Sequence, residues 1–341
     1  MRRIQLLLLS IGTIPALLTT PASAQYIQWR VSVKFILDIN GNRAPATDGA
    51  GNPNFFVTDQ DVLDEIDACN DILALWGEGY QLQLTEIVNV ANRSQWFGVD
   101  ARNATNKSNL ENAAEADPAG YALRNNAINI YINGDDDSGV CSFPDSGDRI
   151  MLFGQGSYTT IFLHEIGHFF NLCHTQGCPC GGCGEAPPQC MSGAIADDIG
   201  DTLLDRACWT RDQISQNNFG NVYGMLNTGQ QIAVDFTWLN IMSYHNNPDR
   251  LTWQQMDKAI HASNGPRNAV AGGSTRFVFW QGDDSRDGLA SANAMRTVLA
   301  AVIRAGNTDQ LWITTGSYPE NITINEPIML RARGGPVTIG N

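Results

Sequence analysis

Three histidines and one glutamate in the segment HEIGHFFNLCH have the types and spacing of a metal-dependent catalytic site. His164 and His168 are four residues apart, so on a helix they lie on one face, one turn apart. Two imidazoles so placed can occupy two corners of a zinc tetrahedron, and Glu165 beside them can serve a bound water as a base. His174 comes ten residues after His164, so the chain must turn after Phe170 for this residue to become a third ligand.

The turn after this helix needs a residue that accepts a positive φ, and Asn171 is the best candidate in the segment. The alternative interpretation is a chance HExxH, whose histidines are ordinary core or surface residues. Only five histidines occur in 341 residues, and three of them fall within eleven positions. This clustering favours the metal site.

A second motif, NIMSY at residues 240–244, lies downstream. With these two motifs the sequence resembles the metzincin metallopeptidases, which have an elongated zinc motif and a later Met-turn. Among them it is most similar to the pappalysin (cytophagalysin) group, over roughly residues 28–265. It departs from the family at Asn171, where glycine is usual. Asparagine is the next most tolerant residue of that backbone geometry, so we expect the turn to be retained.

The resemblance implies an α+β fold and a role for each motif residue. The expected catalytic domain has a mixed twisted sheet, an active-site helix and a Met-turn, with Met242 as an apolar floor beneath the histidines. Tyr244 is expected near zinc, as a ligand or an oxyanion stabiliser, and a core position beneath the site is its alternative. His245 has no identifiable partner and is assigned to the pocket wall or the surface.

Zinc peptidase chemistry follows from these residues. Three neutral imidazoles leave the fourth zinc position for water, whose pKa the metal brings to about 7. Glu165 then takes the proton from that water and delivers it to the departing amine. The predicted function is a zinc-dependent endopeptidase that acts on proteins or peptides.

Carboxylates around a glycine, between the two motifs, have the chemistry of a calcium site. The ligands would be Asp197, Asp198, Asp201 and Thr202. Their spacing is not that of an EF-hand, but families related to this one often carry calcium in the same region. A solvated acidic loop without metal is the alternative.

Residues 1–24 have the pattern of a secretory signal peptide. Arg2 and Arg3 form the charged start, residues 4–18 are an interrupted apolar run, and residues 22–24 (ASA) match a cleavage site. A membrane anchor is the alternative, but the apolar run is short for a bilayer. We therefore expect a secreted protein, extracellular or periplasmic, without membrane attachment after cleavage.

The charge of the chain agrees with export and argues against two classes of binding partner. The formal charge is −14, and loss of the two signal-peptide arginines takes it to −16. A strongly acidic chain is unsuited to nucleic acid and to anionic membranes.

All eight cysteines follow the predicted signal. An even number in an oxidising compartment favours disulfides, although their connectivity cannot be derived from spacing. A second zinc site is the alternative for part of the cluster. The cysteines are Cys69, Cys141, Cys173, Cys178, Cys180, Cys183, Cys190 and Cys208, and the alternative zinc ligands are Cys178, Cys180 and Cys183.

Hydrophobic periodicity before and after the metal motif predicts a mixed sheet backed by helices. We expect a loop over 92–109, with short helices after it. The expected strands are 26–38, 80–90, 127–132 and 149–153, and the expected helices are 58–76, 158–170 and one that starts at a capping box in 252–255.

The pattern changes after Gly273, and residues 25–272 and 273–341 are assigned to separate domains. The run at 316–341 resembles the opening coils of a right-handed parallel β-helix of the pectate-lyase type, which implies a contact with carbohydrate. The expected elements are strand 276–280, helix 289–304 and strands 311–315, 321–325, 328–333 and 337–339.

Two functions therefore compete. The first is the secreted zinc endopeptidase, and the second is a carbohydrate-directed β-helix module, for binding or lyase activity, with an incidental or inactive metal domain. The intact HExxH favours the first function, because a decayed peptidase commonly loses Glu165 or a ligand.

Overall fold

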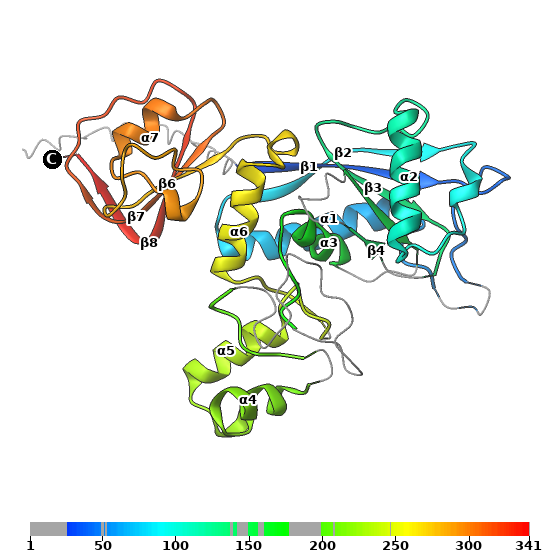
Figure 1. Cartoon of the computed structure of the whole chain (residues 1–341), viewed down its shortest axis with the longest axis horizontal. Coiled ribbons are helices and arrows are strands. Elements are labelled where there is room, and N and C mark those ends of the chain that lie inside the picture. The colour runs from blue at the N-terminus through cyan, green and yellow to red at the C-terminus, as the bar shows by residue number, and fades with distance from the viewer. Residues whose placement is uncertain are drawn as a thin grey trace, which may run out of the picture.

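A five-stranded sheet forms the centre of the molecule (Figure 1), which we describe from a computed structural model. The described residues are 26–48, 51, 53–136, 139–141, 149–155, 160–176, 199–206, 209–245 and 247–340. The strand order is β2–β1–β3–β5–β4, in which the first four strands are parallel and β4 is an antiparallel edge. The strands are β1 (Ile27–Ile36), β2 (Tyr80–Val90), β3 (Ile128–Asn133), β4 (Gly139–Val140) and β5 (Ile150–Gly154).

Alternating apolar side chains on β1 divide the core into two layers. Val31, Val33 and Phe35 belong to the larger layer, together with apolar residues of α1 (Asp59–Trp76) and α3 (Ile161–Phe169). Ile36 belongs to the opposite layer, together with residues of α2 (Ala104–Ala116) such as Leu110. Helices α1 and α3 therefore pack on the same face of the sheet.

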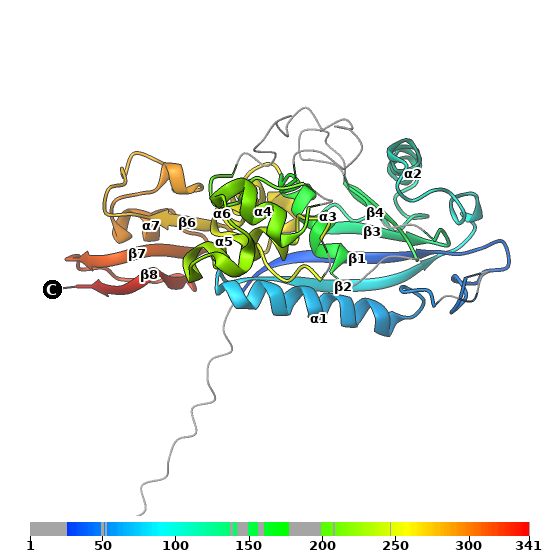
Figure 2. The same cartoon turned by 90° about the horizontal axis from the view of Figure 1, so that it is seen from below.

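Seven α-helices complete the described part of the chain. In the two views α1 runs along β2 on one side of the sheet, and α4 and α5 form a small lobe away from it (Figures 1 and 2). The α-helices are α1 (Asp59–Trp76), α2 (Ala104–Ala116), α3 (Ile161–Phe169), α4 (Arg211–Phe219), α5 (Thr228–Trp238), α6 (Trp253–Asn264) and α7 (Val298–Arg304), and short 3₁₀ turns lie at Ser94–Trp96, Tyr223–Met225, Asn268–Val270 and Ser291–Asn293.

A second, three-stranded parallel sheet lies at one end of the molecule (Figure 1). Its strands are β6 (Thr275–Val278), β7 (Gln310–Tyr318) and β8 (Met329–Ile339). Phe277 and Trp312 of this sheet belong to the same core cluster as the main sheet. The Trp312 indole N–H also donates to the Glu78 carbonyl oxygen at 3.2 Å. The small sheet is thus packed against the rest of the chain. The described residues of the tail form a single three-stranded sheet and do not show the expected β-helix.

Several expected elements of the tail are wrong. The helix expected over 289–304 begins only at Val298, because the preceding segment pairs with β6 through Met295 and Phe277. Residues 321–325 form no strand, and the two expected strands 328–333 and 337–339 are one strand, β8.

The helices of two other regions differ from the expectation. Helix α2 starts at Ala104, inside the expected 92–109 loop, because the Asn103 side chain caps it by accepting the Thr105 and Asn106 N–H groups. Helices α4 and α5 had no counterpart in the sequence prediction. The predicted signal peptide, residues 1–24, lies outside the described residues. Among the described helices, none combines the length and the apolar character needed to cross a bilayer.

Candidate metal centre

Helix α3 is fixed at its start by a carboxylate from another helix. Thr160 precedes the helix with a φ of 71° and provides no side-chain cap. Instead the Glu65 carboxylate of α1 accepts the backbone N–H groups of Thr160, at 2.7 Å, and Phe162, at 2.9 Å. Burial raises the pKa of Glu65 to about 7, against these two hydrogen bonds, which lower it. This contact satisfies N–H groups that a helix start otherwise leaves unpaired.

The end of α3 has the sharp turn that the third histidine requires. Asn171 has a φ of 72°, the left-handed conformation expected for this position. The Leu172 N–H then donates to the Gly167 carbonyl oxygen at 2.8 Å, which closes the turn. As a result the chain reverses, and His174 returns to the face of α3 that carries the first two histidines.

The three imidazoles converge on one point. The Nε2 atom of His174 lies 3.2 Å from Nε2 of His164 and 3.0 Å from Nε2 of His168. The Nδ1 atom of His164 contacts the Ile241 carbonyl oxygen at 2.6 Å, and that of His168 contacts the Leu172 carbonyl oxygen at 2.7 Å. Because a carbonyl only accepts, these Nδ1 atoms carry the hydrogens, and the two Nε2 atoms present bare lone pairs.

These residues fit a zinc ion. Tetrahedral zinc with bonds of about 2.0–2.1 Å would hold its nitrogen ligands roughly 3.3–3.4 Å apart, close to the distances above. Burial lowers the pKa of His164 to about 4 and that of His168 to about 3, and it places the pKa of His174 well below its ordinary value. The imidazoles are therefore neutral at neutral pH, as metal ligands must be. Among the histidine, cysteine and acidic side chains in the described ranges, His164, His168 and His174 lie close enough together to hold a metal ion.

Glu165 is buried beside the cluster and is held by the edge of the sheet. Its carboxylate accepts the backbone N–H of Cys141, directly after β4. Burial raises the pKa of Glu165 to about 8, against this hydrogen bond, which lowers it. A carboxyl group with a pKa near neutrality is suited to both accepting and returning a proton.

Met242 lies beneath the cluster, in a turn that we call the 240–245 turn. A Cβ atom added at Gly167 would overlap the Met242 sulfur, so the glycine of α3 makes room for this buried side chain. The Asn240 carboxamide accepts the Met242 N–H at 2.9 Å and exchanges two hydrogen bonds with Gln255 of α6. The turn is thereby attached both to α3 and to α6.

Tyr244 lies next to the histidines rather than in the core. Its ring centre is 4.5 Å from that of His174 and 6.0 Å from that of His164, and the residue is 54% exposed. The pKa of Tyr244 is raised to about 12, first by desolvation of the phenol and then by the charge of Glu165. The phenol therefore remains a hydrogen-bond donor at neutral pH.

His245 is not a wall or surface residue, so that expectation is wrong. It is buried, and its Nε2 contacts both carboxylate oxygens of Asp205, at 2.9 and 3.0 Å. No motif relates the two residues, which are 40 positions apart, so sequence spacing provided no signal for the pair.

The described residues do not form the predicted calcium site. Asp197 and Asp198 lie outside the described residues, whereas Asp201 accepts the Gln254 N–H at 3.0 Å, at the start of α6. The Thr202 hydroxyl donates to the Ile199 carbonyl oxygen at 3.2 Å. Both described residues thus have protein partners.

The structure describes three of the eight cysteines. Cys173 is disulfide-bonded, and Cys69 is a buried free thiol whose pKa burial raises. The third is Cys141, whose backbone N–H binds Glu165. Cys178, Cys180, Cys183, Cys190 and Cys208 lie outside the described residues.

Several solved structures match this chain in part, and two of them are the following. No protein-family model matches the chain, and no curated protein does. The structure described as a chaperone-substrate complex matches 43% of this chain with 11% identity and a TM-score of 0.30, and the chain spans 27% of that structure's length. The structure of mirolysin in complex with compound 9 matches 72% of this chain and 96% of that chain, with 13% identity and a TM-score of 0.42. Both TM-scores are below 0.5, so function is inferred below from the chain's own residues.

Proposed function

We propose that this chain is a zinc-dependent endopeptidase that hydrolyses peptide bonds in proteins or peptides. The observation that carries the proposal is the convergence of three Nε2 atoms, on the buried His164 and His168 and the half-buried His174, with a buried carboxyl group beside them. Because the hydrogens of His164 and His168 lie on Nδ1, at most one of the three Nε2 atoms carries a hydrogen for the other two to share, whereas one cation satisfies all three.

Glu165 is the proposed general base. When bound, zinc supplies a Lewis acid that polarises a scissile carbonyl and makes water acidic enough to react near neutral pH. The Glu165 carboxylate takes the proton of the attacking water and returns it to the leaving amine. The pKa of about 8 that burial gives Glu165 is that of the metal-free site, and the positive charge of a bound zinc ion would lower it, which makes the carboxylate form available as the base near neutral pH.

Tyr244 is the proposed oxyanion stabiliser. Its phenol lies beside His174 and is half-exposed, so it borders both the metal ligands and the solvent from which substrate arrives. A neutral phenol with a pKa of about 12 can donate a hydrogen bond to the negative charge that develops on the substrate oxygen.

The proposal also includes the expectations from the sequence about export, domains, disulfides and calcium. We propose export by residues 1–24, a peptidase domain at 25–272 and a tail at 273–341. We also propose disulfides in the Cys173–Cys208 region and a structural calcium ion near Asp201. Phe277 and Trp312 of the tail are buried in the core, whereas Trp280 is 65% exposed. The metal cluster and Glu165, and not the tail, favour the peptidase over the carbohydrate-directed alternative.

Metal analysis combined with a mixed-peptide library tests the proposal. The dialysed protein should contain zinc and cleave internal peptide bonds. A strong chelator should abolish cleavage, and added zinc should restore it. Cleavage that survives complete metal removal, or a zinc-loaded protein that cleaves no peptide in the library, would overturn the proposed function.

A further inference from the structure

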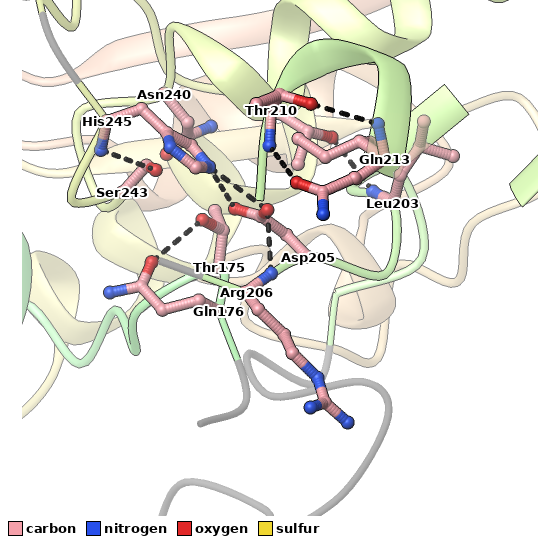
Figure 3. A network of polar contacts seen from close by, with 12 residues as sticks. Thr175, Gln176, Leu203, Asp205, Arg206, Thr210, Gln213, Asn240, Ser243 and His245 are labelled. Carbon is pink, nitrogen blue, oxygen red and sulfur yellow. Dashed lines mark hydrogen bonds and ion pairs between the residues drawn. The ribbon is translucent and has the colours of Figure 1, made fainter. Parts of the chain in front are cut away.

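A buried acid–histidine pair lies behind the metal cluster. Figure 3 shows Asp205 and His245 facing each other, with His245 Nε2–H within 3.0 Å of both carboxylate oxygens. The Asp205 side chain is fully buried and that of His245 is 2% exposed. Trp238 stacks on the imidazole, with ring centres 3.9 Å apart and planes inclined by 14°. The Nε2 atom of His245 is thus committed to Asp205 and does not serve as a fourth metal ligand.

The pair connects the segments that carry the metal ligands. Asp205 pairs through its backbone with Gln176, two residues after His174. His245 ends the 240–245 turn, and the Thr175 N–H donates to the Met242 carbonyl oxygen in this turn at 3.1 Å. The segment 174–176 therefore runs between Asp205 and the 240–245 turn, and the pair ties the two sides together.

The 240–245 turn also orients a ligand directly. The Ile241 carbonyl oxygen accepts the Nδ1–H of His164 at 2.6 Å, so the position of the turn sets the rotation of that imidazole. Tyr244 directly precedes His245 in the same turn. A displacement of the turn would therefore move the partner of His164 and the proposed oxyanion donor together.

We propose that Asp205 and His245 are a positioning pair that fixes the 240–245 turn and thereby the Nε2 atoms of His164 and His174. The inference rests on the proposed metal site. It adds two residues that are not metal ligands but affect how tightly the metal binds. Partners hydrogen-bonded to metal ligands typically change metal affinity roughly 10–100-fold when mutated. Because the pair acts through the backbone of the turn, we expect an effect of about tenfold, at the lower end of that range.

The alternative is a pair that stabilises the fold without affecting the metal. Thr210 provides a matched control, because it caps α4 in the same lobe and its hydroxyl accepts the Gln213 N–H (Figure 3). Thr210→Ala should lower stability through the loss of a helix cap, while the hydrogen bonds of the 240–245 turn remain intact.

The experiment measures Co²⁺ binding to the metal-free full chain by competition with a chelator, together with the visible spectrum of the bound Co²⁺. The variants are Asp205→Asn, which keeps an oxygen acceptor but removes the charge, and His245→Phe, which keeps the stack on Trp238 but removes the N–H donor. The double variant and Thr210→Ala complete the set. Melting temperatures are measured on the same metal-free samples.

We expect Asp205→Asn and His245→Phe each to weaken Co²⁺ binding about tenfold and to alter the visible spectrum. The double variant should bind no more weakly than the worse single variant, because both changes break one interaction. Thr210→Ala should lower the melting temperature with an unchanged dissociation constant. Either single variant suffices for the comparison if the other does not fold, and failure of both to fold would assign the pair to fold stability and overturn the inference.

Two results would contradict the account in different ways. Variants that melt earlier but bind Co²⁺ with the wild-type constant and spectrum would overturn the positioning role and leave the proposed function intact. A wild-type chain that binds no Co²⁺ would instead overturn the metal site on which the proposed function depends.

Discussion

The histidine cluster and the Asp205–His245 pair are two buried imidazole sites on opposite sides of one turn, and they are completed in different ways. In the pair, the Nε2–H of His245 meets a carboxylate, so its hydrogen-bonding requirement is satisfied within the protein. In the cluster, the Nε2 atoms of His164, His168 and His174 meet one another. Burial alone therefore does not distinguish a metal-ligating histidine from a structural one. The chemical group that faces the Nε2 atom distinguishes them.

Removal of one imidazole from each site is the strongest way to break this comparison. His168→Ala should reduce the zinc content of dialysed protein from about one ion per chain to nearly none, because two imidazoles and water hold zinc far more weakly than three. His245→Phe should retain about one ion after the same dialysis, because it keeps all three ligands. Elemental analysis measures both variants, and stoichiometric zinc in His168→Ala would remove this residue from the ligand set.

Replacement of the carboxylate beside the cluster tests chemistry separately from metal binding. Glu165→Ala should retain zinc and lose about 10²–10⁴ in kcat, the usual contribution of a general base. Peptide turnover and zinc content are measured on the same preparation. Turnover at the wild-type rate would mean that another residue accepts the proton.

Acid should destabilise the metal-free chain through the cluster. The folded-state pKa values of His164 and His168 are lowered to about 4 and 3, whereas unfolded histidines bind protons below about 6.5. At these histidines the unfolded chain takes up more protons in this window, so their contribution to stability falls as the pH drops from about 6.5 towards 4, by up to about 1.4 kcal/mol per pH unit for each histidine. The buried carboxyl groups of Glu65 and Glu165 act in the opposite direction, because their raised pKa values make the folded chain bind more protons.

Urea unfolding in a chelator at pH 7 and pH 5 measures the histidine contribution as a difference between wild type and variant. His168→Phe should be destabilised less by the lower pH than the wild type, because it lacks one of these protonation sites. Replacement of the exposed His261 by Gln is the control and should leave the change in stability between the two pH values as it is in the wild type. The same change in wild type and His168→Phe would contradict the assignment.

The smallest effect is expected at Tyr244. Tyr244→Phe should keep zinc and lower kcat by roughly tenfold or more, less than the loss of Glu165, because one neutral hydrogen-bond donor is removed from the oxyanion. Steady-state kinetics with one peptide substrate measures it. An unchanged kcat would assign Tyr244 to packing against His174.

The sequence predicted well where the local pattern determines the structure. Strands β1, β2, β3 and β5 and helices α1 and α3 follow hydrophobic periodicity, and the turn at Asn171 follows from the spacing of His168 and His174, whereas the two-residue edge strand β4 was not predicted.

Features that depend on distant contacts were missed. The Asp205–His245 pair and the Glu65 cap of α3 join residues 40 and about 95 positions apart, and no periodicity encodes either contact. Pairing of Met295 with β6 likewise displaces the helix that the alanine-rich stretch before Val298 favours. Local propensity decides an element only where no tertiary partner competes for the same backbone.

X-ray absorption at the zinc edge tests the central claim most directly, because it reports the atoms around the metal in the intact protein. The account predicts a nitrogen and oxygen shell at about 2.0–2.1 Å, with the outer-shell pattern of three imidazoles. Loss of that pattern in His168→Ala would confirm that His168 is one of the zinc ligands. A sulfur shell near about 2.3 Å would contradict it, since it would place the zinc on cysteines such as Cys178, Cys180 and Cys183 instead of on His164, His168 and His174.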